Sequence, residues 1–127
     1  MRLLLDTCIF LWFISGDNRL PENIREAISN TENEIFLSVI SIWESIVKYQ
    51  LGKLPLPRPP SEYLPEQRER HQIESLPLDE ESVIYLPKLP SIHRDPFDRM
   101  LICQAIKNQL ILVTVDNYIR SYPVKTM

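Results

Sequence analysis

Four acidic residues stand beside the most apolar segments of this 127-residue chain. Asp6 follows the run LLL, and Asp116 follows LILVTV. Glu44 lies about a turn and a half into the helix expected after EIFLS. Asp98 lies in the stretch His93–Ala105, HRDPFDRMLICQA, just before that last run. Carboxylates gathered at one place repel each other and resist the loss of water, so a cluster of them implies a bound cation. Oxygen ligands favour Mg²⁺ or Mn²⁺, and the sequence shows no zinc pattern of His and Cys.

A divalent cation held by carboxylates would support the hydrolysis of a phosphodiester. The ion lowers the pKa of a bound water, orients the phosphate and stabilises developing negative charge. One of the more weakly held carboxylates would accept the proton from the attacking water. The formal net charge of −3 excludes a global positive field that attracts nucleic acid, so phosphate contacts must be local. Nearby cations for this role are Arg94, Arg99 and Lys48, with Arg120 a further candidate.

Each acid also has a simpler interpretation as a helix cap. Asp95 followed by Pro96 is typical of a helix start, and Asp98 lies three residues further on, at the positive end of the helix dipole. Asp6 and Asp116 precede expected helices, and Glu44 could complete a capping box with Ser41. The metal-site hypothesis therefore depends on the four acids meeting at one place.

The hydrophobic pattern predicts strands that alternate with helices. The expected strands are Arg2–Leu5, Glu34–Ser38, Ile73–Leu76 and Leu110–Val115, with an edge strand at Val124–Thr126. The expected helices are Cys8–Ser15, one opened by Pro21, Val39–Leu51, Ser61–His71, Asp79–Leu86, one from Pro96, and a last turn at Tyr118–Tyr122. The strands are apolar without polar alternation, which is typical of a parallel sheet buried on both faces. Sites in such sheets form beyond the carboxyl ends of the strands, where all four acids are expected.

Two further expectations concern the helix Val39–Leu51 and the proline-rich segment after it. Ile40, Trp43, Ile46 and Val47 are spaced to form the buried stripe of this helix. The segment Leu54–Pro65 is interpreted as a stiff crossover loop.

Length and composition predict a single domain, residues 1–127. Two cysteines, Cys8 and Cys103, fit reduced thiols in a cytoplasmic protein better than a disulfide framework. The apolar start MRLLLDTCIFLWFI is interrupted by Asp6 and is too short to span a bilayer, so no membrane association is expected.

The motifs LLLDT, SIWE, HRDPFDRMLICQA and LVTVD, in this order, resemble those of a PIN domain. More narrowly, they look like those of the VapC-type toxins of bacterial type II toxin–antitoxin modules. The resemblance implies a Rossmann-like α/β/α sandwich with a short, mostly parallel sheet and a Mg²⁺- or Mn²⁺-dependent endoribonuclease that leaves a 3′-hydroxyl and a 5′-phosphate. It places the family's acidic positions on the same four residues, with Asp95 and Thr114 in support. It also implies an RNA substrate, a VapB-like antitoxin and a homodimer.

Three alternatives remain open at this stage. The chain could be a catalytically silent binding module of the same fold, or a nuclease that acts on DNA. It could also be a phosphate-transfer protein with Asp6 as nucleophile. One such fold, that of the haloacid dehalogenases, requires a second Asp where this chain has Cys8, and a receiver fold requires a strand-end lysine for which no convincing candidate exists.

Overall fold

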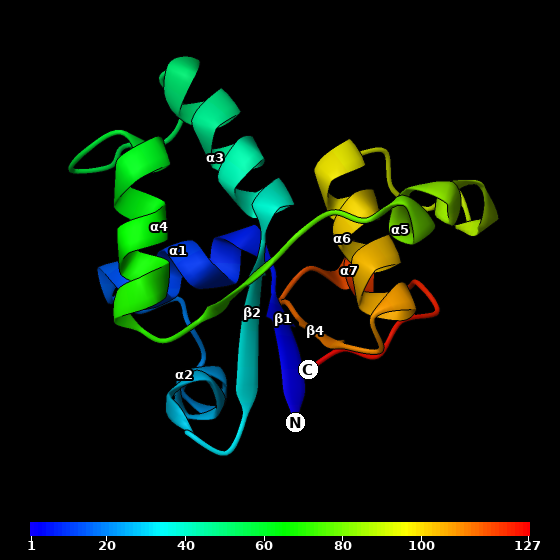
Figure 1. Ribbon diagram of the computed structural model, residues 1–127, viewed down its shortest axis with the longest axis horizontal. Helices are drawn as coiled ribbons and strands as arrows, with labels where there is room; N and C mark the ends of the chain where they lie inside the picture. The colour runs from blue at the N-terminus through cyan, green and yellow to red at the C-terminus, as the bar shows by residue number, and fades with distance from the viewer.

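The computed structural model describes residues 1–127, which form a parallel four-stranded sheet between two layers of helices (Figure 1). The strands are β1 (Arg2–Leu5), β2 (Glu34–Ser38), β3 (Glu74–Leu76) and β4 (Ile111–Val113), in the order β3-β2-β1-β4. Every pair of neighbouring strands is parallel. The predicted α/β sandwich with a short parallel sheet is therefore confirmed.

Side chains of β1 alternate between the two hydrophobic clusters, because successive residues of a strand point to opposite faces. Leu3 and Leu5 belong to the cluster covered by α1 (Thr7–Ser15), α2 (Glu22–Ser29) and α4 (Pro60–Arg70). Leu4 belongs to the other cluster, which is covered by α6 (Pro96–Lys107) and α7 (Asn117–Arg120). Helix α5 (Glu80–Ile84) and a 3₁₀ turn (Leu86–Lys88) lie beside α6. Burial on both faces explains why Leu3, Leu4 and Leu5 of the central strand β1 are all apolar.

The predicted helices and the four main strands are present, with shifts at their ends. The predicted crossover loop Leu54–Pro65 is helical from Pro60, where α4 begins with a proline in its first turn. Strand β4 stops at Val113, two residues before the predicted end, because the chain turns at Thr114 and Val115 into α7. Helix α5 ends at Ile84 and gives way to the 3₁₀ turn. The predicted edge strand Val124–Thr126 is reduced to a single parallel bridge between Leu112 and Thr126. No helix combines the length and the hydropathy that crossing a bilayer requires.

The prediction that Trp43 belongs to the buried stripe of the helix α3 (Val39–Gln50) is wrong, because Trp43 is 57% exposed. The buried residues of α3 are instead Ile40, Ser41, Glu44 and Ser45. Helix α3 projects beyond the end of β2 and contacts α1, α4 and α6, so it packs against helices rather than over the sheet (Figure 1). Trp43 packs edge-to-face on Phe97 of α6, with ring centroids 4.9 Å apart.

Candidate metal centre

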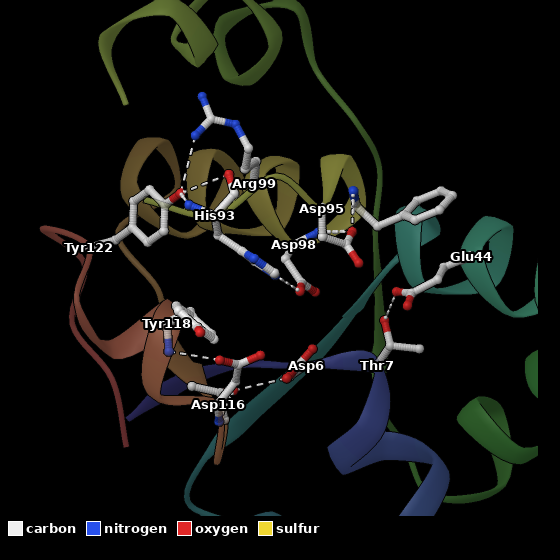
Figure 2. A network of polar contacts seen from close by, with 12 residues as sticks. Asp6, Thr7, Glu44, His93, Asp95, Asp98, Arg99, Asp116, Tyr118 and Tyr122 are labelled. Atoms are coloured by element: carbon white, nitrogen blue, oxygen red, sulfur yellow. Dashed lines mark hydrogen bonds and ion pairs between the residues drawn. The ribbon is translucent and has the colours of Figure 1, made fainter. Parts of the chain in front are cut away.

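A cleft of about 550 Å³ opens at the carboxyl ends of the strands. All four predicted acids line it, and so do Asp17 and Asp95. Of the four, Asp6 follows β1, Glu44 lies in α3, Asp98 lies in α6, and Asp116 follows β4 (Figure 2). The cations that line the cleft are Arg19, Lys48 and Lys53. The edge of the sheet thus gathers side chains that are up to 110 residues apart, from Asp6 to Asp116, in agreement with the general rule for open parallel sheets.

Asp6 occupies the N-cap position of α1, but its side chain makes no capping hydrogen bond. The capping interpretation is therefore wrong for this residue. Its Oδ2 instead accepts a hydrogen bond from Thr114 Oγ1 at 2.9 Å, which connects the ends of β1 and β4. Asp6 is only 6% exposed. Burial raises its pKa to about 6 against the Thr114 hydrogen bond, and the charges of Glu44 and Asp116 add to the increase.

Glu44 does not form a capping box either. The N-cap of α3 is Ser38, whose hydroxyl accepts from Ile40 N, and Ser41 lies inside the helix. Glu44 is 4% exposed, and its Oε1 accepts from Thr7 Oγ1 at 2.8 Å. Its Oε2 pairs with Lys48 Nζ at 2.5 Å. Lys48, expected to contact phosphate, therefore already compensates the charge of one acid at the edge of the cleft.

Asp95 and Asp98 have different surroundings although they share the first turn of α6. Asp95 Oδ1 accepts from the backbone N–H groups of Phe97 and Asp98, so the predicted N-cap is present. Asp98 caps nothing, and its Oδ2 lies 3.0 Å from Nε2 of His93. Burial, followed by the charges of Asp6 and Asp95, raises the pKa of Asp98 to about 7, against the effect of the His93 hydrogen bond.

Asp116 is a helix cap and also lines the cleft. Its Oδ1 accepts from Tyr118 N at 2.8 Å, which caps α7 as the simpler interpretation predicts. Its own backbone N–H donates to Thr114 Oγ1 at 3.0 Å. Because the Thr114 hydroxyl accepts from Asp116 and donates to Asp6, this one buried side chain sets the spacing between the two acids.

The other predicted phosphate contacts do not line the cleft. Arg99 donates to Pro90 O at 2.9 Å and to Tyr122 Oη at 3.1 Å. Arg120 donates to Thr114 O, and Arg94 lines a separate apolar groove. Arg19 and Lys53 line the cleft although the sequence does not predict it. They lie in the segments that follow α1 and α3, and no sequence pattern indicates where such segments lead.

His93 is the other residue that the sequence reasoning missed. The two histidines are far apart in the chain and form no zinc pattern, so the sequence does not mark either as part of a site. The available signal was the position of His93 five residues before Asp98. One ligand atom from each of His93, Asp98 and Asp116 lies within 4.8 Å of the others, close enough for the three to share a metal ion.

The donor set fits a hard divalent cation. Asp6 and Asp116 make no ion pair with Arg or Lys, and the ion pair of Asp98 is with His93 alone. The raised pKa values of Asp6 and Asp98 show that nothing in the protein compensates their charges in full. The acids of the cleft offer carboxylate oxygens, and oxygen ligands favour Mg²⁺ or Mn²⁺ over zinc.

A parallel α/β sandwich with an acidic cleft at the carboxyl edge of its sheet defines a class of proteins suited to bind a cation and a phosphate. The family model of the PIN domain matches residues 3–125. The chain therefore belongs to the PIN domain family.

Similar proteins include a VapC ribonuclease and VapBC proteins of known structure. The chain is 38% identical over 55 residues to Ribonuclease VapC16 of Mycobacterium tuberculosis, a match that covers 43% of this chain and 39% of that protein. Its fold is similar to VapBC2 from Rickettsia felis, bound to a promoter DNA fragment, with a TM-score of 0.73, 20% identity, and coverage of 100% of this chain and 98% of that one. DNA-bound VapBC from Salmonella typhimurium gives a TM-score of 0.70 at 24% identity, with coverage of 100% and 97%. The resemblance predicted from the motifs is confirmed.

Proposed function

We propose that this PIN domain is a metal-dependent endoribonuclease, a toxin of the VapC type. The observation that carries the proposal is that Asp6, Glu44, Asp98 and Asp116 line one cleft. Asp6 is buried and Asp98 half-buried, and neither makes an ion pair with Arg or Lys. The name of the similar Ribonuclease VapC16 supports RNA as the substrate. The alternative of a phosphate-transfer protein has no support from the fold, since the family is that of PIN domains.

Asp6, Asp98 and Asp116 would hold Mg²⁺ or Mn²⁺, with Glu44 as a direct ligand or one that acts through water. The ion, when bound, supplies an acidified water and a positive charge for the phosphate. One oxygen of Asp6 accepts a hydrogen bond from Thr114 Oγ1, and one of Asp116 accepts from Tyr118 N. Asp98 Oδ2 lies 3.0 Å from Nε2 of His93, so each carboxylate has a partner in the protein that fixes its direction. Orientation in advance lowers the cost of assembling the site.

The proton and the phosphate would be handled by different parts of the cleft. A weakly held carboxylate accepts the proton from the attacking water. The RNA backbone would meet the cations that line the cleft, namely Lys53, which makes no ion pair, and Lys48 and Arg19, which are paired with Glu44 and Asp17. Since the chain carries a formal net charge of −3, this local group of cations, rather than the overall charge, would attract RNA.

Removal of the metal tests the proposal directly. Purified protein, free of any co-purified partner, should cut total RNA with Mn²⁺, stop with EDTA, and cut again when Mn²⁺ is added in excess. Single-stranded and double-stranded DNA of the same sequences serve as controls for a DNA nuclease. RNA cleavage that persists in EDTA would contradict the metal mechanism. Mn²⁺ binding without any RNA cleavage would support the catalytically silent binding module.

We also propose a VapB-like antitoxin as partner, because the similar structures from Rickettsia felis and Salmonella typhimurium are VapBC complexes. A partner segment that enters the cleft would need a cationic side chain to face its acids. We further propose that residues 1–127 act as one domain in the cytoplasm. The free thiols of Cys8 and Cys103 suit a reducing compartment, and the two hydrophobic clusters share a single sheet.

For the expected homodimer we propose the face around Trp43. Its half-exposed ring borders an apolar groove of about 310 Å³ between α3 and α6, and large aromatic side chains are typical of interface centres. The residues that line this groove are Ile40, Trp43, Leu78, Leu86, Arg94, Pro96, Phe97, Arg99 and Met100.

The substitution Trp43→Glu should convert a dimer into a monomer in sedimentation velocity, because it places a charge where the second copy would exclude water. Leu51→Glu is the matched control: Leu51 is equally exposed, directly follows α3 and lies outside the groove, so this variant should stay dimeric. A wild-type protein that sediments as a monomer at high concentration, or a Trp43→Glu dimer, would overturn the assignment of this face.

A further inference from the structure

His93 lies in the loop before α6 and connects the cleft with the C-terminal helix α7. Its Nε2 lies 3.0 Å from Asp98 Oδ2, and its side chain is 25% exposed. The ring of His93 lies beside Asp98, between that carboxylate and Tyr118, and it does not line the cleft that the acids line (Figure 2). It is thus placed to act on a carboxylate of the cleft rather than on the substrate.

The ring of His93 is itself held in place. It stacks on Tyr118 of α7, with centroids 5.4 Å apart and planes inclined by 10°. The backbone N–H of His93 donates to Tyr122 Oη at 2.8 Å, and this hydroxyl lies 3.4 Å from His93 O. Tyr122 is buried, and Arg99 Nη1 also donates to its hydroxyl at 3.1 Å. Both the backbone and the ring of His93 are therefore fixed by the segment that follows β4.

Asp98 needs such a partner. It belongs to the first turn of α6, between the charges of Asp95 and Asp6, and both charges repel its carboxylate. A donor on one of its oxygens holds the carboxylate in a single direction in spite of that repulsion. The only side-chain contact of Asp98 with this effect is the imidazole of His93.

We propose that His93 is a positioning residue: its Nε2–H holds the Asp98 carboxylate toward the metal-binding aspartates, and Tyr118 and Tyr122 hold His93. The value of this arrangement for metal binding rests on the function proposed above, although the hydrogen bond itself does not. It also gives Arg99 a role, as support for Tyr122 instead of a contact to phosphate.

Mn²⁺ affinity, measured by calorimetry on the full chain near neutral pH, tests the proposal. His93→Ala should weaken Mn²⁺ binding by about tenfold, the scale of lost support behind a metal ligand. His93→Gln should recover part of the affinity, because its amide can donate to Asp98. His71→Ala is the matched control, since His71 lies outside the cleft and packs on Phe13, and it should bind Mn²⁺ like the wild type. Unchanged affinity in His93→Ala would overturn the proposal.

Two spectroscopic measurements separate the remaining outcomes. Nitrogen-15 NMR of the metal-free protein should show His93 protonated at Nε2, and a ring protonated only at Nδ1 would contradict the hydrogen bond whether or not the protein cuts RNA. Electron paramagnetic resonance of bound Mn²⁺ should show no coupling to an imidazole nitrogen. Such a coupling would make His93 a direct ligand, which the closeness of His93, Asp98 and Asp116 would allow, and would overturn the positioning role. Failure of the wild type to cut RNA would instead count against the proposed function alone.

Discussion

Substitution of Asp6 by Asn should lower RNA cleavage by more than about 100-fold while the protein remains folded, since loss of a direct ligand exceeds the usual effect of a supporting residue. The amide oxygen of Asn can still accept the hydrogen bond from Thr114, so the connection between β1 and β4 is retained. What disappears is a buried negative charge that the metal requires. Cleavage assays with Mn²⁺ and thermal unfolding of the same samples measure the two effects.

Asp98→Asn and Asp95→Asn form a matched pair within one turn of α6. Asp98→Asn should lose cleavage to the same extent as Asp6→Asn. Asp95→Asn should keep a large share of activity, because Asn is as good an N-cap as Asp and can accept the same hydrogen bonds from Phe97 N and Asp98 N. The reverse result, with Asp95→Asn inactive and Asp98→Asn active, would show that the ligand assignment is reversed. Loss of the unfolding transition in either variant would identify that acid as structural.

The metal-free protein should become less stable as pH rises from about 4 to 8. Asp6 and Asp98 have raised pKa values of about 6 and about 7, so between the usual carboxyl pKa of 3.8 and these values the folded state binds more protons than the unfolded state. Stability then falls as pH increases through the folded pKa values. For Asp6 the difference between the folded and unfolded pKa corresponds to a loss of about 3 kcal/mol in the free energy of unfolding, at roughly 1.4 kcal/mol per pKa unit. Asp98 is less deeply buried, and its raised pKa also lowers the stability of the folded protein as pH rises.

Denaturant unfolding in EDTA at a series of pH values measures this effect, with the double variant Asp6→Asn/Asp98→Asn as reference. The free energy of unfolding of the wild type relative to the variant should decrease toward high pH. His71, whose pKa is lowered by burial, acts in the opposite direction, but it is present in both proteins and its contribution cancels. Added Mn²⁺ should stabilise the wild type more at pH 8 than at pH 5, since protons and metal compete for the same carboxylates. A free-energy difference that is independent of pH would contradict the burial of these charges.

Several features of the protein follow from the sequence by itself. The apolar runs without polar alternation predict a buried parallel sheet, because only a strand covered on both faces needs apolar residues at every position. The rule that parallel strands present their carboxyl ends at one edge then predicts that Asp6 and Asp116 meet. The N-cap at Asp95 is equally local, since it depends on a side chain and two backbone N–H groups within three residues.

Only the tertiary structure decided which of these acids are caps and which cations reach them. Asp6 and Glu44 occupy sequence positions that suit capping, but Thr114 and Thr7, each more than 30 residues away, bind them instead. Arg19 and Lys53 line the cleft while Arg99 supports Tyr122, because loop paths and not sequence spacing place these long side chains. Trp43 is exposed for the same kind of reason: α3 projects past the sheet, and helical periodicity identifies an apolar face without indicating what packs on it.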